Sequence, residues 1–220
     1  MSETILIEPQ YLPPVEYFAV LLRAEKVIFD QHAFYEKQSY RNRCRILTAN
    51  KVANLSIPIC FGNRRKAPLS EMKIATNDPW AKNHWKSIQS AYGKAPFFEH
   101  YEDFFKPHFE NPPESLLEFD MGLLNTCLRL LGISVDFELS DKYWEPPVSG
   151  LNDFRSKIHP KKNYENNNII TPKPYTQVFG HDFVKNLSVI DLLFCEGPAA
   201  HATIKSSLIK TEQKNHNDVH

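Results

Sequence analysis

The feature that most constrains the fold is the order of the elements predicted for residues 4–29. Thr4–Ile7 is a short apolar run that reads as a buried strand, and three prolines then hold residues 9–14 in an extended loop. Residues 15–26 have the apolar spacing of a helix, and Lys26–Phe29 is a second apolar run. This succession predicts a right-handed parallel crossover. Its first loop would lie at the carboxyl edge of the sheet, where open α/β sheets bind ligands.

The rest of the chain predicts a hairpin, a helical middle and C-terminal helices. Two β-like runs, Cys44–Thr48 and Val52–Ile59, flank Asn50, which tolerates the left-handed conformation of a tight hairpin. Asp78 and Pro79 predict a helix start, with Asp78 as the N-cap. Helical patterns cover residues 79–92, 96–109, 113–131, 186–195 and 198–209, and a strand pattern covers 134–139. We therefore expect an α/β fold with an N-terminal β-loop-α-β unit and a mixed sheet with a β-hairpin.

Length and composition predict a single domain over residues 1–209. The chain has 220 residues, which is enough to bury a core without disulfides or metals. Residues 141–174 are rich in Pro, Asn and Lys and read as a long irregular segment, either a functional lid or disordered. Residues 210–220 are a polar tail that we expect to be disordered.

The charges are balanced in number but not in position. Lys+Arg and Asp+Glu are both 26, yet Lys37 to Lys73 holds nine basic residues and one acid, and Glu99 to Glu145 holds eleven acids and three basic residues. The two segments either neutralise each other, form two faces of opposite sign, or meet at the seam of a homodimer. An isoelectric point near 7.1 argues against a nucleic-acid partner.

The sequence predicts neither a signal peptide nor a membrane span. The N-terminus has no cationic region followed by a long apolar run, and no apolar run approaches the roughly 18 residues of a membrane span. The four cysteines lie far apart, as expected for reduced thiols. We therefore expect a cytoplasmic protein without a membrane span.

The first candidate site is the basic loop that leads into the hairpin. Lys37, Arg41 and Arg43 are interspersed with amides and hydroxyls, among them Asn42, and Arg41, Arg43 and Arg45 share one face of an extended strand. Converging guanidinium groups bind phosphate or carboxylate in a bidentate manner. The alternative is a solvated basic strand that pairs with the acidic middle of the chain.

Two histidines are candidates for acid–base chemistry. Trp80, His84 and Tyr92 fall on one stripe of the predicted helix, and His32 follows the second strand. Tyr11 lies in the proline-held loop, where it could orient a ligand. The alternatives are an aromatic core stripe with a satisfied histidine, a structural His32, and a Tyr11 that packs inward.

The sequence lacks the motifs of several classes of nucleotide-binding, hydrolytic and zinc-binding site. The chain has no phosphate-binding G-x-x-x-x-G-K-[ST], no dinucleotide-binding G-x-G-x-x-G and no G-x-S-x-G. Its histidines and cysteines have no zinc spacing. The sequence therefore predicts neither a metal site nor a cofactor.

The chain resembles the WbqC-like protein family. The residues that carry the resemblance are PQYLPPVEYF (9–18), KQSYRNRCRI (37–46), LSIPI (55–59), HWKSIQSAYGKAPFF (84–98) and NLSVIDLLFCEGPAA (186–200). The family often has His-Gln before the first proline, where this chain has Ile7 and Glu8. If that family His were catalytic, His32 would be the nearest substitute.

The resemblance implies a role in the assembly of O-antigen or another surface polysaccharide, with aminoacyl or sugar transfer as the reaction. A phosphate-bearing donor such as a nucleotide-sugar would be the small anionic substrate. Lys37, Arg41 and Arg43 would bind the donor, Tyr11, Asn42, Trp80 and Tyr92 would contact it, and His84 or His32 would transfer the proton. The alternative is a non-catalytic protein that binds such an anion or serves as a scaffold.

Overall fold

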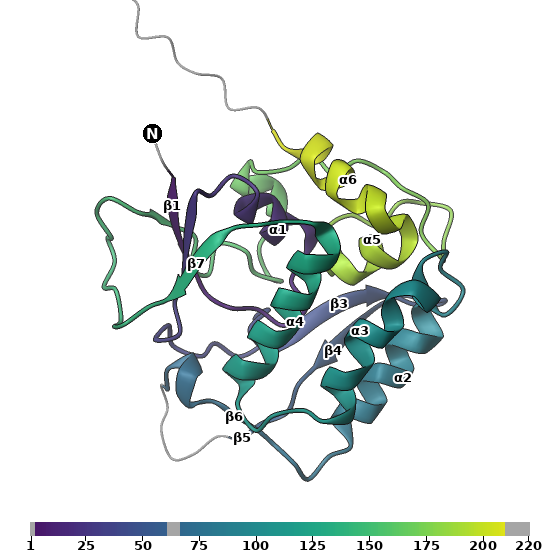
Figure 1. Cartoon of the computed structure of the whole chain (residues 1–220), viewed down its shortest axis with the longest axis horizontal. Coiled ribbons are helices and arrows are strands. Elements are labelled where there is room, and N and C mark those ends of the chain that lie inside the picture. The colour runs from purple at the N-terminus through teal and green to yellow at the C-terminus, as the bar shows by residue number, and fades with distance from the viewer. Residues whose placement is uncertain (1–2, 61–66, 210–220) are drawn as a thin grey trace, which may run out of the picture.

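A four-stranded parallel sheet is the central element of the computed structural model, which describes residues 3–60 and 67–209 (Figure 1). The strand order is β7-β2-β1-β8. The strands are β1 (Thr4–Ile7), β2 (Lys26–Phe29), β7 (Asp136–Leu139) and β8 (Asn152–Asp153). Every neighbouring pair is parallel, so the carboxyl ends of all four strands meet at one edge.

The predicted β-loop-α-β unit is confirmed. Helix α1 (Val15–Leu21) joins β1 to β2, and all of its side chains are buried. Ile5 pairs with Val27, and Ile7 pairs with Phe29. Strand β1 has its successor β2 on one side and the last strand, β8, on the other, so the strand order reverses beside β1. Ligands of open α/β sheets bind outside such a reversal point.

The antiparallel pairs form small sheets of their own. Strands β3 (Arg43–Leu47) and β4 (Val52–Ser56) make the predicted hairpin, and β5 (Ile59–Cys60) pairs with β6 (Lys73–Ile74). The 3-10 helix η1 (Leu69–Glu71) precedes β6. Parallel and antiparallel pairing together with the helices confirm the α/β class.

Three helices form the middle of the chain, as predicted. They are α2 (Trp80–Tyr92), α3 (Phe98–Glu110) and α4 (Leu116–Leu131). Ser115 caps α4 by accepting a hydrogen bond from the Glu118 amide at 3.3 Å, and Gly132 ends it with a φ of 64°. The N-cap of α2 is Pro79, without a side-chain hydrogen bond, so the prediction that Asp78 caps this helix is wrong.

The irregular segment contributes to the sheet. Residues 141–174 contain β8, which pairs with β1, and the 3-10 helix η2 (Tyr164–Asn167). Helix α5 (Val189–Glu196), the short η3 (Gly197–Ala199) and α6 (Ala200–Ser207) follow beside α1 (Figure 1). The predicted disordered tail, 210–220, lies outside the described residues.

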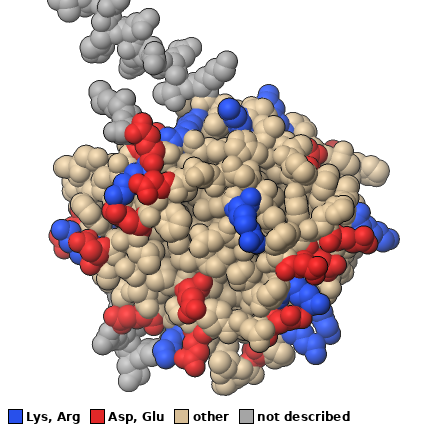
Figure 2. Space-filling model, viewed as in Figure 1, with Lys and Arg blue, Asp and Glu red and all other residues tan. Residues whose placement is uncertain are grey.

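The oppositely charged segments contact each other at the surface. Lys73 pairs with Glu114 at 3.3 Å, and both side chains are exposed. Figure 2 shows basic and acidic side chains next to each other around the rim of one face, whose centre is mostly uncharged. None of the helices among the described residues is long and apolar enough to cross a membrane.

Candidate functional site

A pocket of about 360 Å³ opens at the carboxyl edge of the parallel sheet. Two segments that are far apart in sequence form its wall, one after β2 and one around β8. The lining residues are Ala33, Phe34, Tyr35, Glu36, Arg41, Tyr143, Pro146, Asp153, Arg155 and Ser156. Pockets of about 420 Å³ at residues 174–183 and about 300 Å³ at the start of α2 have no arginine in their linings.

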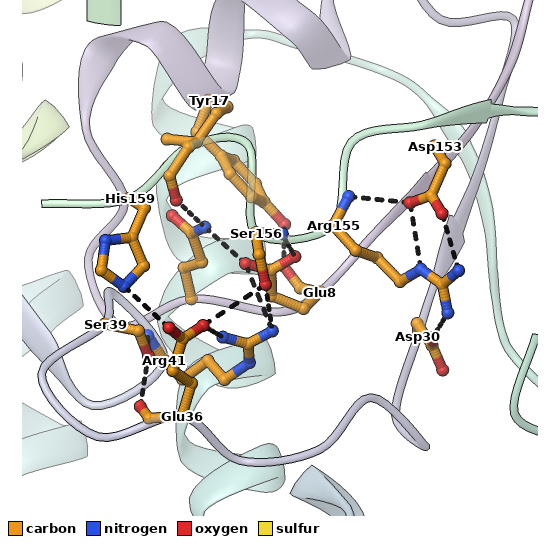
Figure 3. Close-up of polar contacts among 12 residues, drawn as sticks. Glu8, Tyr17, Asp30, Glu36, Ser39, Arg41, Asp153, Arg155, Ser156 and His159 are labelled. Atoms are coloured by element: carbon orange, nitrogen blue, oxygen red, sulfur yellow. Dashed lines mark hydrogen bonds and ion pairs between the residues drawn. The ribbon is translucent and has the colours of Figure 1, made fainter. Parts of the chain in front are cut away.

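Arg155 ties together the strand ends on one side of the pocket (Figure 3). Its Nη1 donates to Asp30 Oδ2 at 2.7 Å, and its Nη2 and Nε donate to the Asp153 carboxylate at 2.6 and 3.0 Å. Asp30 is fully buried at the end of β2, and Ser140 after β7 also donates to it at 3.0 Å. Burial raises the pKa of Asp153, but hydrogen bonds from Arg155 outweigh this and hold it below its usual value. Arg155 therefore links the ends of β2 and β8, and Asp30 extends the link to Ser140 after β7.

Arg41 is the second buried guanidinium at the pocket. Its Nη1 donates to Glu36 Oε2 at 3.2 Å, and its Nη2 donates to Ser156 Oγ at 3.0 Å. Nη2 also lies 3.8 Å from Glu8 Oε1. The side chain is 3% exposed, so these two carboxylates compensate a charge that would otherwise be costly to bury.

Glu8 is the buried carboxylate at the end of β1. Its Oε1 accepts from Gln10 Nε2 at 3.1 Å, and its Oε2 accepts from the Ser156 amide at 3.0 Å. The Tyr17 hydroxyl on α1 donates to the Glu8 carbonyl at 3.0 Å. Glu8 thus fixes the start of the proline-held loop against the segment that follows β8.

Glu36 lines the pocket and lies beside His159, which is absent from the lining. His159 Nε2 lies 3.4 Å from Glu36 Oε1, without hydrogen-bond geometry. His159 Nδ1 accepts from the Lys161 amide at 3.1 Å, so the neutral ring carries its hydrogen on Nε2, which faces Glu36. Burial lowers the pKa of His159, although Glu36 opposes this. The Glu36 side chain is 48% exposed, which leaves it open to a ligand.

Tyr11 and His84 meet in the core. The Tyr11 hydroxyl lies 3.0 Å from His84 Nδ1, and Trp80 packs edge-on against the imidazole with 5.2 Å between ring centroids. Burial lowers the pKa of His84 to about 4, even though a hydrogen bond with the Ser56 backbone opposes the shift. His84 is therefore neutral near pH 7, and it does not line the pocket.

Tyr92 connects α2 to other elements. Its hydroxyl donates to Asp191 Oδ2 on α5 at 3.0 Å and accepts from the Leu47 amide of β3 at 3.2 Å. Trp80, His84 and Tyr92 therefore lie on one buried stripe of α2, as their spacing predicts, and their contacts are with the core.

The predicted basic loop is divided between the pocket and the hairpin. Arg41 lines the pocket, whereas Arg43 Nε donates to Ser56 Oγ at 3.1 Å across the hairpin. Asn42 Nδ2 donates to the Ile57 carbonyl at 2.8 Å, and Lys37 is exposed. The His32 amide donates to Asp30 Oδ1 at 3.0 Å. Of the residues predicted to bind substrate, the structure places Arg41 in the pocket lining.

Some buried polar atoms have no hydrogen-bond partner, and of the residues that carry them Arg41 lines the pocket. In the part of the chain that the structure describes, they are Gln10 Oε1, Arg41 Nε, Asn42 Oδ1, Asp120 Oδ1 and Oδ2, Trp144 Nε1 and His159 Nε2. Gln10 contacts Glu8, and the Trp144 carbonyl accepts from Arg155 at 2.7 Å. Protein interiors pair the large majority of such atoms. The unpaired Nε of Arg41 is thus an exception among residues of the pocket lining.

Seven charged or polar residues of the site were not predicted as binding groups from the sequence. They are Glu8, Asp30, Glu36, Asp153, Arg155, Ser156 and His159. Glu8 and Asp30 directly follow predicted strands, and a charged residue at that place is a signal that could have found them. Arg155 follows β8, a strand of two residues without a periodic pattern, so the sequence held no comparable signal for it.

Comparison with known proteins gives a family match that covers most of the pocket. A model described as the WbqC-like protein family matches residues 8–154, which include the pocket lining up to Asp153. The chain belongs to the WbqC-like protein family. The resemblance inferred from the sequence is thus confirmed. Arg155, Ser156 and His159 lie just beyond the range that matches the WbqC-like model.

The chain is also similar to the uncharacterized protein Rv1507c of Mycobacterium tuberculosis. The two are 28% identical over 148 residues, which cover 64% of each chain. The matched residues thus span less than two thirds of the length of this relative. No solved structure matches. No group of three or more His, Cys, Asp or Glu among the described residues is arranged to hold a metal ion.

Proposed function

We propose that the protein is a cytoplasmic transferase in surface-polysaccharide assembly and that the pocket binds its phosphate-bearing donor. The biological setting rests on the family resemblance, and the transferred group would be a sugar or an aminoacyl group. The observation that carries the binding role is that Arg41 and Arg155, whose side chains are 3% and 8% exposed, both line this pocket.

The pocket has the chemistry for such a donor. Arg41 lines the pocket, and a guanidinium is a planar, charged donor suited to the oxygens of a phosphate. Phe34 and Tyr143 are 43% and 37% exposed, and their ring centroids lie 5.1 Å apart. Exposed aromatic faces beside an arginine suit a planar base or the apolar face of a sugar ring.

Glu36 is the group that we assign to proton transfer, in place of His84 or His32, because it lines the pocket and they do not. Arg41, Ser156 and His159 surround its carboxylate within 3.2 to 3.4 Å and fix its position. In the reaction an acceptor hydroxyl gives its proton to Glu36 as its oxygen bonds to the donor carbon. The bond from that carbon to the leaving oxygen breaks, and the leaving phosphate keeps the electron pair.

Calorimetric titration with a set of nucleoside diphosphate sugars and with inorganic pyrophosphate tests the binding role. Arg41→Lys keeps the charge but loses the planar fork, so we expect affinity to fall at least about tenfold. Arg43→Lys is the matched control, because Arg43 lies two positions away and contacts Ser56 instead of the pocket. Equal losses in both variants, or none in either, would contradict the assignment of Arg41.

A non-catalytic binding protein is the second candidate. It is favoured by the absence of His84 and His32 from the pocket lining. It is also favoured by the hydrogen bonds that Arg41 and Arg155 already donate to carboxylates of the protein. Glu36→Gln separates the two functions. A transferase loses turnover of the bound donor, as followed by phosphorus NMR, and retains donor affinity, whereas a binding protein shows no turnover in either form.

A further inference from the structure

The charged side chains that are most accessible in the pocket are carboxylates. Its described lining holds two arginines and two acids. The side chains of Arg41 and Arg155 are 3% and 8% exposed. Those of Asp153 and Glu36 are 26% and 48% exposed. A ligand that enters the pocket therefore meets negative charge at its accessible surface, which favours a positively charged group on that ligand.

One oxygen of Glu36 is placed to accept a hydrogen bond from such a group (Figure 3). Both hydrogen bonds that the described residues donate to this carboxylate, from Arg41 and Ser156, end on Oε2. The other oxygen, Oε1, lies 3.4 Å from His159 Nε2 without hydrogen-bond geometry. Glu36 can therefore accept an N–H of a ligand through Oε1 while Arg41 and Ser156 hold Oε2.

Two aromatic rings line the same pocket as Glu36. Phe34 and Tyr143 are 43% and 37% exposed, and their ring centroids lie 5.1 Å apart. Arg155 Cζ lies 5.5 Å from the centroid of the Tyr143 ring, so this ring already attracts one cation. An ammonium group of a ligand is attracted to aromatic faces in the same way. A carboxylate and aromatic rings in one lining are thus the chemistry of an ammonium site.

The lysines beside this place are engaged elsewhere. Lys162 Nζ donates to the Ser156 carbonyl at 2.8 Å, and Lys157 Nζ lies 4.6 Å from the centroid of the Phe154 ring. No lysine is among the described residues of the lining. The exposed part of Glu36 therefore faces a pocket into which the protein itself brings no ammonium group.

We propose that the acceptor of the transfer is an amino sugar, whose ammonium group donates to Glu36 Oε1 and packs against Phe34 and Tyr143. The inference rests on the proposed function, because the acceptor is that of the proposed transferase, and it adds the chemical class of that acceptor. Neighbouring carbons of an amino sugar carry the ammonium group and a hydroxyl. The contact with Glu36 thus brings a hydroxyl to the carboxylate that takes its proton, and the donor phosphate binds at Arg41.

Saturation-transfer NMR titrations with glucosamine and glucose test the ammonium site at pH 6, where the amine is charged. The two sugars differ at one carbon, and glucosamine should bind roughly tenfold or more tightly, as expected for a hydrogen bond between charged groups. N-acetylglucosamine, in which the same nitrogen is uncharged, should bind like glucose. Equal affinities for glucosamine and glucose would overturn the inference, and so would a protein that binds neither.

Three variants locate the preference for glucosamine. Glu36→Gln should abolish it, and Tyr143→Leu, at an exposed ring, should reduce it roughly two- to fivefold. Glu99→Gln is the matched control, because Glu99 is exposed on α3 and absent from the lining, and it should keep the full preference. A preference that Glu36→Gln retains, or that Glu99→Gln also loses, would contradict the site. If Glu36→Gln does not fold, an unchanged preference in Tyr143→Leu overturns the inference instead.

The inference and the proposed function fail in different ways. A protein that prefers glucosamine but binds neither nucleoside diphosphate sugars nor inorganic pyrophosphate would refute the proposed donor and leave the ammonium site standing. A protein that binds those phosphates but does not distinguish glucosamine from glucose would refute the ammonium site and leave the donor standing.

Discussion

Two neighbouring polar regions of this protein bury charge in opposite ways. In the first, the pocket network, each arginine is paired with two carboxylates from different parts of the chain. Its members are Glu8, Asp30, Glu36, Arg41, Asp153 and Arg155. The second, the occluded cluster, consists of Tyr11, Cys44, His84 and Asp120, and no ion pair is found within it among the described residues.

The difference appears in two aspartates. Hydrogen bonds from Arg155 hold the pKa of Asp153 below its usual value despite burial, whereas burial alone raises that of Asp120. The pocket network thus favours the ionised form of an aspartate, whereas the occluded cluster favours the protonated form. The comparison teaches that burial decides the protonation state where no opposite charge reaches the group.

The largest expected effect is in the pocket network. Arg155→Ala leaves the fully buried Asp30 without its guanidinium, which should lower the free energy of unfolding by about 3–5 kcal/mol. Urea denaturation at pH 7 measures the change. Lys157→Ala removes an exposed cation two positions away and should cost far less. If the two variants are equally stable, the ion pair with Asp30 is not what holds the strand ends together.

His84 should make the occluded cluster sensitive to acid. Its pKa is about 4 in the folded protein and near 6.5 in the unfolded chain, so the unfolded chain binds the proton more readily. The stabilisation that comes from burying the neutral imidazole is present above pH 6.5. As the pH falls to 4, the free energy of unfolding declines by about 3 kcal/mol for this reason. His84→Gln should lack this part of the decline in denaturation curves at each pH. The same change at the exposed His181 should leave the decline as it is in the wild type.

Leucine at two of the fully buried aspartates, Asp30 and Asp120, should have opposite effects. Asp120→Leu removes an unpaired polar group and should stabilise the fold by about 1–3 kcal/mol at pH 8. Asp30→Leu leaves Arg155 without one of its carboxylates and should destabilise it. Thermal unfolding of the two variants under one condition measures both signs. Destabilisation by both would show that Asp120 has a partner after all.

The smallest expected effect concerns the hydroxyl of Tyr11. Tyr11→Phe removes the hydrogen bond with His84 and should lower the free energy of unfolding by roughly 1 kcal/mol. Because Tyr11 lies outside the pocket lining, the affinity for pyrophosphate should not change. Denaturation and calorimetry on one preparation give both values. A large loss of affinity would place Tyr11 with the pocket network instead.

Most of the elements could be predicted because their patterns are local. The strands at Thr4–Ile7 and Lys26–Phe29 and the helix that ends at Gly132 follow from apolar spacing and terminal residues. The cap of α2 was missed because the preference for Asp at an N-cap is weaker than the local geometry, in which Pro79 itself takes that place.

The candidate site could be predicted only in part. Arg41 was found because basic residues at alternate positions are a visible pattern, but its neighbour Arg43 turns to the hairpin. The second arginine of the pocket, Arg155, is 114 positions further along in a segment without periodicity. The sequence could not show that this segment returns to pair with β1.

The sequence by itself determined the parallel crossover unit, the hairpin, the main helices, the family and the chemical types present in the basic loop. Tertiary structure alone decided which charges meet. It brought Arg155 to Asp30 and Arg41 to Glu8, and it enclosed His84 and Asp120 where water cannot stabilise their charged forms. The physical reason is that propensity and periodicity act between near neighbours in the chain, whereas ion pairing and desolvation depend on residues that only the folded chain brings together.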